Sequence, residues 1–136
     1  MPIPSIGGGY QPYDGNLNEV RLSAAPVPAT ATASATLTVD KLINGMLLGS
    51  PGATAASYTL PTVTELENVL SAARVGSTFD LNVINIDGSA AGVITLVTNT
   101  GWTLVGLMTV AATAGTAQMF RARKTGLGTW SLYRLG

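Results

Sequence analysis

Four of the chain's seven basic residues lie within residues 119–136, and these four are Arg121, Arg123, Lys124 and Arg134. Such a cluster could bind phosphate groups and so form a nucleic-acid site. Affinity for nucleic acid, however, depends on neutralising many phosphates at once, and seven acidic residues balance the seven basic ones in this chain. We therefore expect no nucleic-acid partner. We interpret these basic residues as side chains on the charged faces of strands, where they pair with Asp80, Asp87 or a neighbouring copy of the chain.

Catalytic and metal-binding residue types are scarce. Cys and His are both absent, which excludes thiolate zinc sites, cysteine nucleophiles and the Ser-His-Asp arrangement. The run from Gly7 to Gly9 matches neither G-x-G-x-x-G nor a P-loop, so a hinge is a better interpretation than a phosphate cradle. We expect no enzyme activity, no metal and no cofactor. A small hydrolase with a Ser-Lys or two-carboxylate site remains the weakest alternative.

The overall composition favours self-association. Charged residues make up 10% of the 136 residues, against about 25% in a typical soluble domain, and Thr, Ala, Gly and Ser take their place. The net charge of zero supplies no repulsion between copies. The N-terminus lacks the pattern of a signal peptide, and no apolar run approaches the length of a membrane span, so no membrane partner is expected.

Residues 1–36 are predicted to form an extended arm. Five prolines oppose regular helix, and the stretch Pro26 to Thr36 is of low complexity. Large side chains are nevertheless spaced along the segment, which favours an arm that becomes ordered on a partner. An untethered tail with incidental aromatic residues is the alternative. The candidate binding residues of the arm are Ile3, Ile6, Tyr10, Tyr13, Leu17 and Leu22.

Residues 37–136 are predicted to form a mainly β domain, either a β-sandwich or a jelly-roll-like fold, with one short helix. Thr62 and Glu65 match a capping box, and apolar residues from Val63 to Ala73 follow helical spacing, with Gly76 as the expected stop. Thr38 to Gly45 is expected to form a brief helical turn. About eight short strands follow from period-two patterns and turn residues. They are expected near residues 46–48, 57–60, 79–83, 93–97, 102–105, 107–110, 117–124 and 129–135.

The last two of these strands are expected to pair as a hairpin around Thr125 to Gly128. The alternation of the first strand places Phe120 and Ala122 on one face and Met119, Arg121 and Arg123 on the other. The candidate contacts between copies of the chain are Met119, Arg121, Arg123, Trp130 and Leu132.

Four segments, taken in order, resemble a recurring domain of bacteriophage virion proteins, especially head decoration or cement proteins and capsid-attached fibres. These segments are Ser57 to Thr62, Ala73 to Asn85, Gly101 to Gly106, and Phe120 to Gly126 with Thr129 to Tyr133. The resemblance implies a β-sandwich or jelly-roll-like homotrimer on the outer capsid surface, without enzymatic activity and with the major capsid protein as its partner. On this view residues 1–36 are the capsid-binding arm.

A fibre head or a receptor- or carbohydrate-binding domain of a phage is the alternative function. In that case Trp102, Tyr58 or Trp130 would form a platform on which a sugar ring stacks. Trp and Tyr in β proteins are, however, more often core or interface residues. The family contains both decoration proteins and fibre domains, so the resemblance does not separate the two functions.

Overall fold

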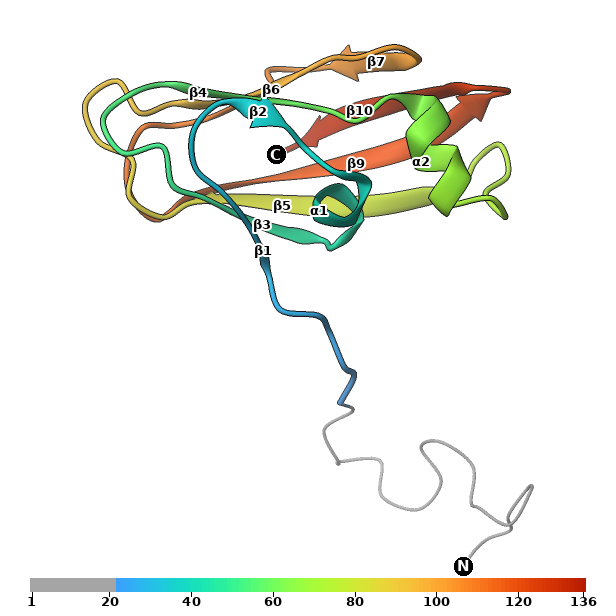
Figure 1. Ribbon diagram of the computed structural model, residues 1–136, viewed down its shortest axis with the longest axis horizontal. Helices are drawn as coiled ribbons and strands as arrows, with labels where there is room; N and C mark the ends of the chain where they lie inside the picture. The colour runs from blue at the N-terminus through green and yellow to red at the C-terminus, as the bar shows by residue number, and fades with distance from the viewer. Residues whose placement is uncertain (1–21) are drawn as a thin grey trace, which may run out of the picture.

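The structure is a computed structural model that describes residues 22–136. Two β-sheets pack together, and two short helices lie at their margin (Figure 1). The larger, six-stranded sheet contains β1 (Ala29–Ala31), β3 (Met46–Gly49), β5 (Thr78–Asn85), β9 (Thr116–Gly126), β10 (Thr129–Leu135) and β7 (Trp102–Val105), in that spatial order. The four-stranded sheet contains β2 (Ala35–Thr36), β4 (Ala56–Thr59), β6 (Ile94–Val97) and β8 (Thr109–Val110). The predicted mainly β fold is confirmed.

The chain winds between the two sheets and does not fold into consecutive hairpins. From β1 to β8, each strand lies in the sheet opposite to that of the strand before it. Next-but-one strands therefore become neighbours, so that β1, β3 and β5 run parallel, and β2, β4 and β6 run parallel. A jelly roll is built from antiparallel strands, and this parallel winding does not match it. The predicted hairpin of β9 and β10 is present and antiparallel.

A single core fills the space between the sheets. The six-stranded sheet contributes Leu47, Leu81, Val83, Phe120 and Leu132, and the four-stranded sheet contributes Tyr58, Ile94, Leu96 and Val110, all of them buried. The sheets approach closely at Gly49, where a Cβ atom would lie 2.3 Å from Cδ1 of Ile94. A side chain at this position of β3 would therefore displace the terminal methyl of Ile94 and tighten the contact with the Tyr58 ring.

Both helices start as the sequence predicts. In α2 (Val63–Val69), the Thr62 hydroxyl accepts from the backbone N–H of Glu65 and the Glu65 carboxylate accepts from that of Thr62, which forms the predicted capping box. In α1 (Val39–Ile43), the cap is Thr38, and Gly45 follows with φ +94°. The expected stop of α2 at Gly76 is wrong, since Leu70 already leaves the helical conformation.

The predicted boundary between arm and domain at residue 36 lies too far along the chain. Ala29–Ala31 pairs with β3 and Ala35–Thr36 pairs with β4, so residues 29–36 belong to the sheets. The buried Tyr58 hydroxyl donates to the carbonyl oxygens of Ala31 at 3.1 Å and Thr32 at 2.7 Å, which anchors this segment. These two edge strands consist of small residues, so their sequence carries no strand pattern. Their pairing comes from backbone groups that β3 and β4 offer.

Candidate interaction surface

Strand β9 brings two of the clustered cations onto the outer face of the six-stranded sheet. Arg121 forms a bidentate pair with Asp80 of β5, with Nε 2.7 Å from Oδ1 and Nη2 3.2 Å from Oδ2. This hydrogen bonding lowers the pKa of Asp80 and raises that of Arg121. The predicted pairing with Asp80 is therefore confirmed. Within residues 22–136, Arg123 forms no ion pair.

Asp87, the second expected partner of the cations, has a different role. Its carboxylate accepts from the Ser50 hydroxyl at 2.7 Å and from the Gly52 backbone N–H at 3.0 Å. Asp87 therefore holds the loop that follows β3, and the structure contradicts the expectation that it pairs with a cation of the closing segment. The segment after Asp87 leads into β6 of the opposite sheet.

Lys124 faces the interior side of the hairpin. Its ammonium group lies 2.5 Å from Oε2 of Glu67 on α2, and the same oxygen accepts from the indole N–H of Trp130 at 3.1 Å. The hydrogen bond from Lys124 is the main cause that lowers the pKa of Glu67. This arrangement fastens α2 to the hairpin, so Lys124 and Glu67 have a structural role.

Two of the five candidate contacts between copies are corrected by the structure. Trp130 is 1% exposed and Leu132 is fully buried, so neither can touch another molecule without opening the core. Trp130 packs against Phe79 and Trp102, with ring centroids 5.7 Å and 6.2 Å away. The alternation of β10 puts these two residues on the inner face. Met119, Arg121 and Arg123 lie on the outer face and are exposed.

The proposed sugar platform is also contradicted by burial. Trp102 is 7% exposed, and its indole N–H donates to the carbonyl of Pro61 at 2.7 Å. Tyr58 is fully buried, and burial raises the pKa of its phenol. With Trp130 in the core as well, none of the three rings offers a face on which a sugar could stack.

The outer face of the six-stranded sheet carries a mixture of apolar, charged and uncharged polar side chains. Registers place Met46 beside Asn82 and Asn82 beside Met119, with Leu135 next to Met119. Along the adjacent row, Asp80, Arg121, Tyr133 and Val105 lie side by side. Met46 and Met119 are each 39% exposed and Val105 is 45% exposed. We call this surface, which also includes Leu48, Ile84 and Arg123, the methionine face.

The outer face of the four-stranded sheet has a different chemistry. The registers bring Ser57, Thr95 and Thr109 into one row and Thr36, Thr59 and Val97 into the next. No charged residue belongs to these rows. We call this surface the threonine face.

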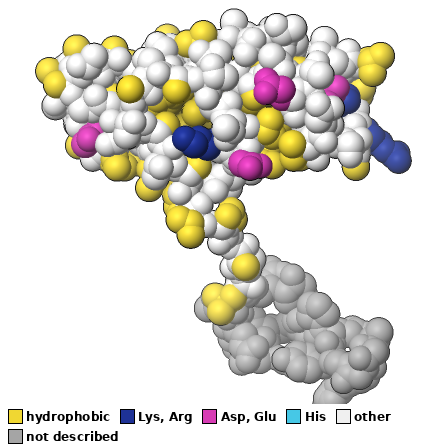
Figure 2. Space-filling model, viewed as in Figure 1, with side chains coloured by type: hydrophobic (Ala, Val, Ile, Leu, Met, Phe, Trp, Pro, Cys, Tyr) yellow, Lys and Arg dark blue, Asp and Glu magenta, His cyan; other side chains and the backbone are white. Residues whose placement is uncertain are grey.

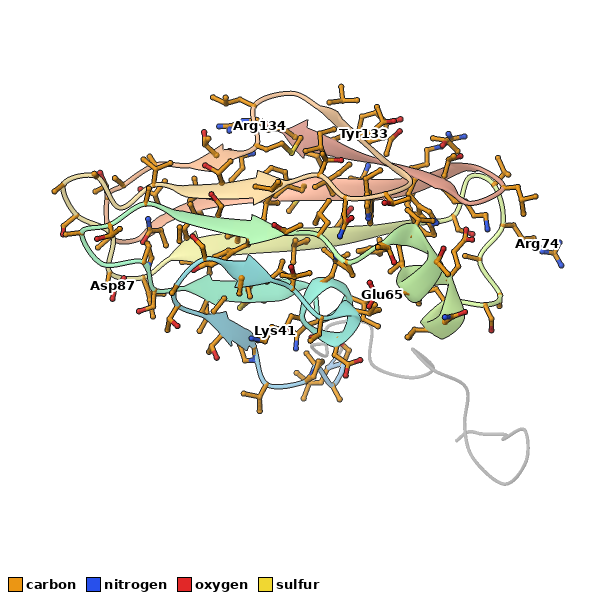
Figure 3. All side chains as sticks on the ribbon, turned by 45° about the horizontal axis from the view of Figure 1, so that its top comes forward. Lys41, Glu65, Arg74, Asp87, Tyr133 and Arg134 are labelled. Carbon is orange, nitrogen blue, oxygen red and sulfur yellow. The ribbon has the colours of Figure 1, made fainter. Side chains whose placement is uncertain are left out.

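The hollow that the structure shows beside α2 has a neutral lining. A groove of about 380 Å³ lies beside α2, and its lining of Val69 to Ala73, Ser77 to Phe79 and Trp130 contains no acidic or basic side chain. Within residues 22–136, no group of three acidic side chains could hold a metal ion. Figure 3 places Arg74 and Asp87 at opposite ends of the molecule, and Figure 2 shows charged side chains few and spread over the visible face.

The arm residues Ile3, Ile6, Tyr10, Tyr13 and Leu17 lie outside the described residues. Leu22 and Val27 are described and are 89% and 85% exposed. The side-chain amide of Asn44 donates to the Val27 carbonyl at 2.8 Å. From there toward the N-terminus, the described residues run away from the sandwich (Figure 1).

No helix in the part of the chain that the structure describes is long and apolar enough to cross a membrane. Comparison of the chain with protein-family models, with curated proteins and with solved structures found no match.

Proposed function

We propose that this chain is a structural, non-enzymatic attachment protein, specifically a trimeric decoration protein on the outer surface of a phage capsid, with the major capsid protein as its partner. The observation that carries the proposal is the segment Leu22 to Val27. It leaves the sandwich without regular secondary structure and holds two apolar side chains, Leu22 and Val27, almost entirely in solvent. An apolar segment of this kind is suited to insertion into pockets on another protein.

Multivalency gives this arrangement its strength. A single extended arm loses much conformational entropy when it is ordered, so its individual affinity is modest. Three arms held together by associated domains bind as one unit, because the second and third arms dock at high effective concentration. Self-association and attachment therefore support each other in the proposed function.

The test is deletion of residues 1–28, followed by co-sedimentation with capsids that lack the protein. The deletion ends just before β1, so the sandwich should keep its circular dichroism spectrum and its melting temperature. Capsid binding should fall at least tenfold. Replacing Tyr10 and Tyr13 with Ala should weaken binding in the same direction but less.

The matched control is Leu127→Ala, which removes an apolar side chain that is 95% exposed but lies in the β9–β10 loop. This variant should bind capsids like the unaltered protein. Full capsid occupancy by the truncated protein would contradict the proposed attachment through the arm. Loss of binding in Leu127→Ala would place the attachment site at the hairpin tip.

A further inference from the structure

We propose that the methionine face is the surface through which copies of this chain associate. The inference rests on the proposed function and deepens it, because it names the surface and the partner, a second copy of the same chain. Of the two outer faces, this one has the composition and the charge arrangement that such a contact needs.

The composition of the methionine face matches that of protein interfaces. Interface cores are enriched in Met, aromatic residues and Arg, and depleted in Ser. The methionine face presents Met46, Met119, Tyr133 and Arg121, and Met119 lies in β9, one of the two central strands of the sheet. Three hydroxyl side chains of this sheet's outer surface, Thr78, Ser131 and Thr103, lie in one row with Arg123, so the large apolar side chains gather beside that row. The threonine face presents five hydroxyl side chains and one valine. Burial of the methionine face therefore removes more apolar area from water.

Symmetry requires that each copy uses one face. The outer faces of a two-layer sandwich point in opposite directions, so pairing the methionine face of one copy with the threonine face of the next would produce an open stack. A closed assembly forms when every copy turns the same face toward the common axis. Six strands at about 4.8 Å spacing, with a mean strand length of about 20 Å, give the outer face of the larger sheet a flat area of roughly 500 Å². A standard interface buries roughly 800 Å² on each partner, so this face could supply the larger part of one.

The charges on the methionine face can complement each other across such an axis. Asp80 and Arg121 already pair within one copy, which reduces the cost of bringing them close to another protein. Arg123 lies two residues further along β9 on the same face and has no acidic partner in residues 22–136. We expect the Arg123 guanidinium to meet the Asp80 carboxylate of a neighbouring copy at the rim of the contact.

The experiment compares Met119→Glu with Ser57→Glu in the full chain, by sedimentation equilibrium and circular dichroism. Met119 and Ser57 are both exposed, and each lies on an inner strand of its sheet. Met119→Glu should raise the concentration at which half of the copies are associated by at least tenfold, because it places a charge in the apolar centre. Ser57→Glu should leave that concentration unchanged.

A second readout uses the absence of native Cys. The variants Met119→Cys and Ser57→Cys each contain a single thiol, so any disulfide formed on oxidation must join two copies. We expect crosslinked dimers with Met119→Cys and none with Ser57→Cys, because a disulfide needs Cα atoms within about 7 Å. This readout also covers the case in which Met119→Glu fails to fold.

Three outcomes would overturn the inference: an unaltered protein that is monomeric at micromolar concentration, equal loss of association in both Glu variants, or crosslinking through residue 57 alone. If copies still associate in Met119→Glu while the arm deletion abolishes capsid binding, the proposed surface is wrong and the attachment function stands. If Met119→Glu dissociates the copies but the protein without residues 1–28 binds capsids normally, the association surface stands and the proposed attachment through the arm is wrong.

Discussion

The methionine face and the threonine face both arise from the alternation of side chains along strands, and they differ in the types of side chain that they expose. In both sheets the inward positions of the strands bury large apolar residues, and the outward positions are left to solvent. One outward surface nevertheless combines Met46, Met119 and Val105 with charged residues, and the other combines hydroxyl groups with a single valine. Alternation along a strand thus identifies the outward residues but not the chemistry of the assembled face.

The two faces can be compared as outer surfaces only if the two sheets share one core. Trp130→Ala tests this, and it has the largest expected effect on the free energy of unfolding. The indole is almost fully buried and packs against Phe79 and Trp102. Its removal should lower the free energy of unfolding by about 3–5 kcal/mol in urea titrations. Met119→Ala, on the opposite side of the hairpin, should change it by less than about 1 kcal/mol. Unchanged stability in Trp130→Ala together with loss of association would show that Trp130 is an interface residue after all.

Glu67→Ala should have an intermediate effect, because it leaves the buried indole N–H of Trp130 without its acceptor. We expect a loss of about 1–3 kcal/mol in the free energy of unfolding. Glu67→Gln keeps an oxygen acceptor for Trp130 and loses only the charge that faces Lys124, so its loss should be smaller. Equal losses in the two variants would show that the charge, and not the acceptor, matters.

Acid should abolish the difference in the free energy of unfolding between the unaltered protein and Glu67→Gln. The pKa of Glu67 is lower in the folded than in the unfolded protein, mainly because Lys124 donates to the carboxylate. The stabilisation is therefore complete above the ordinary carboxyl pKa of about 4.3 and is lost as the pH falls through the lower pKa of the folded state. Urea titrations between pH 7 and pH 3 measure it. A difference that grows toward low pH would contradict the assigned direction.

The smallest effect is expected for Arg121→Gln, which breaks the pair with Asp80 on the methionine face. Both partners are solvent-exposed in the single copy. When Arg121→Gln is combined with a dissociating substitution such as Met119→Glu, the free energy of unfolding should therefore hardly change. In the associating protein, the same substitution should weaken association, because Asp80 loses its partner within the copy at the rim of the contact. Equal effects in both backgrounds, measured by urea titration and sedimentation, would argue against burial of this pair between copies.

Several features could be predicted from the sequence because their causes are local. The capping box of α2, the turn at α1 and the inward position of Phe120 and Ala122 depend on residues a few positions apart. The end of α2 and the strands at residues 29–31 and 35–36 could not be predicted in this way. They depend on packing and on backbone groups of distant strands, which leave no periodic pattern in short, small-residue segments.

The sequence by itself determined that strands dominate, that the chain holds few charged residues, and which side chains of β9 share a face. Only the tertiary structure decided that Trp130, Leu132, Trp102 and Tyr58 lie inside the core, and that Asp80 meets Arg121 while Asp87 holds a loop. The physical reason is the separation of the partners along the chain. Asp80 and Arg121 are 41 residues apart, and Glu67 and Trp130 are 63 residues apart. The order of strands in the two sheets, which no local pattern encodes, brings them together.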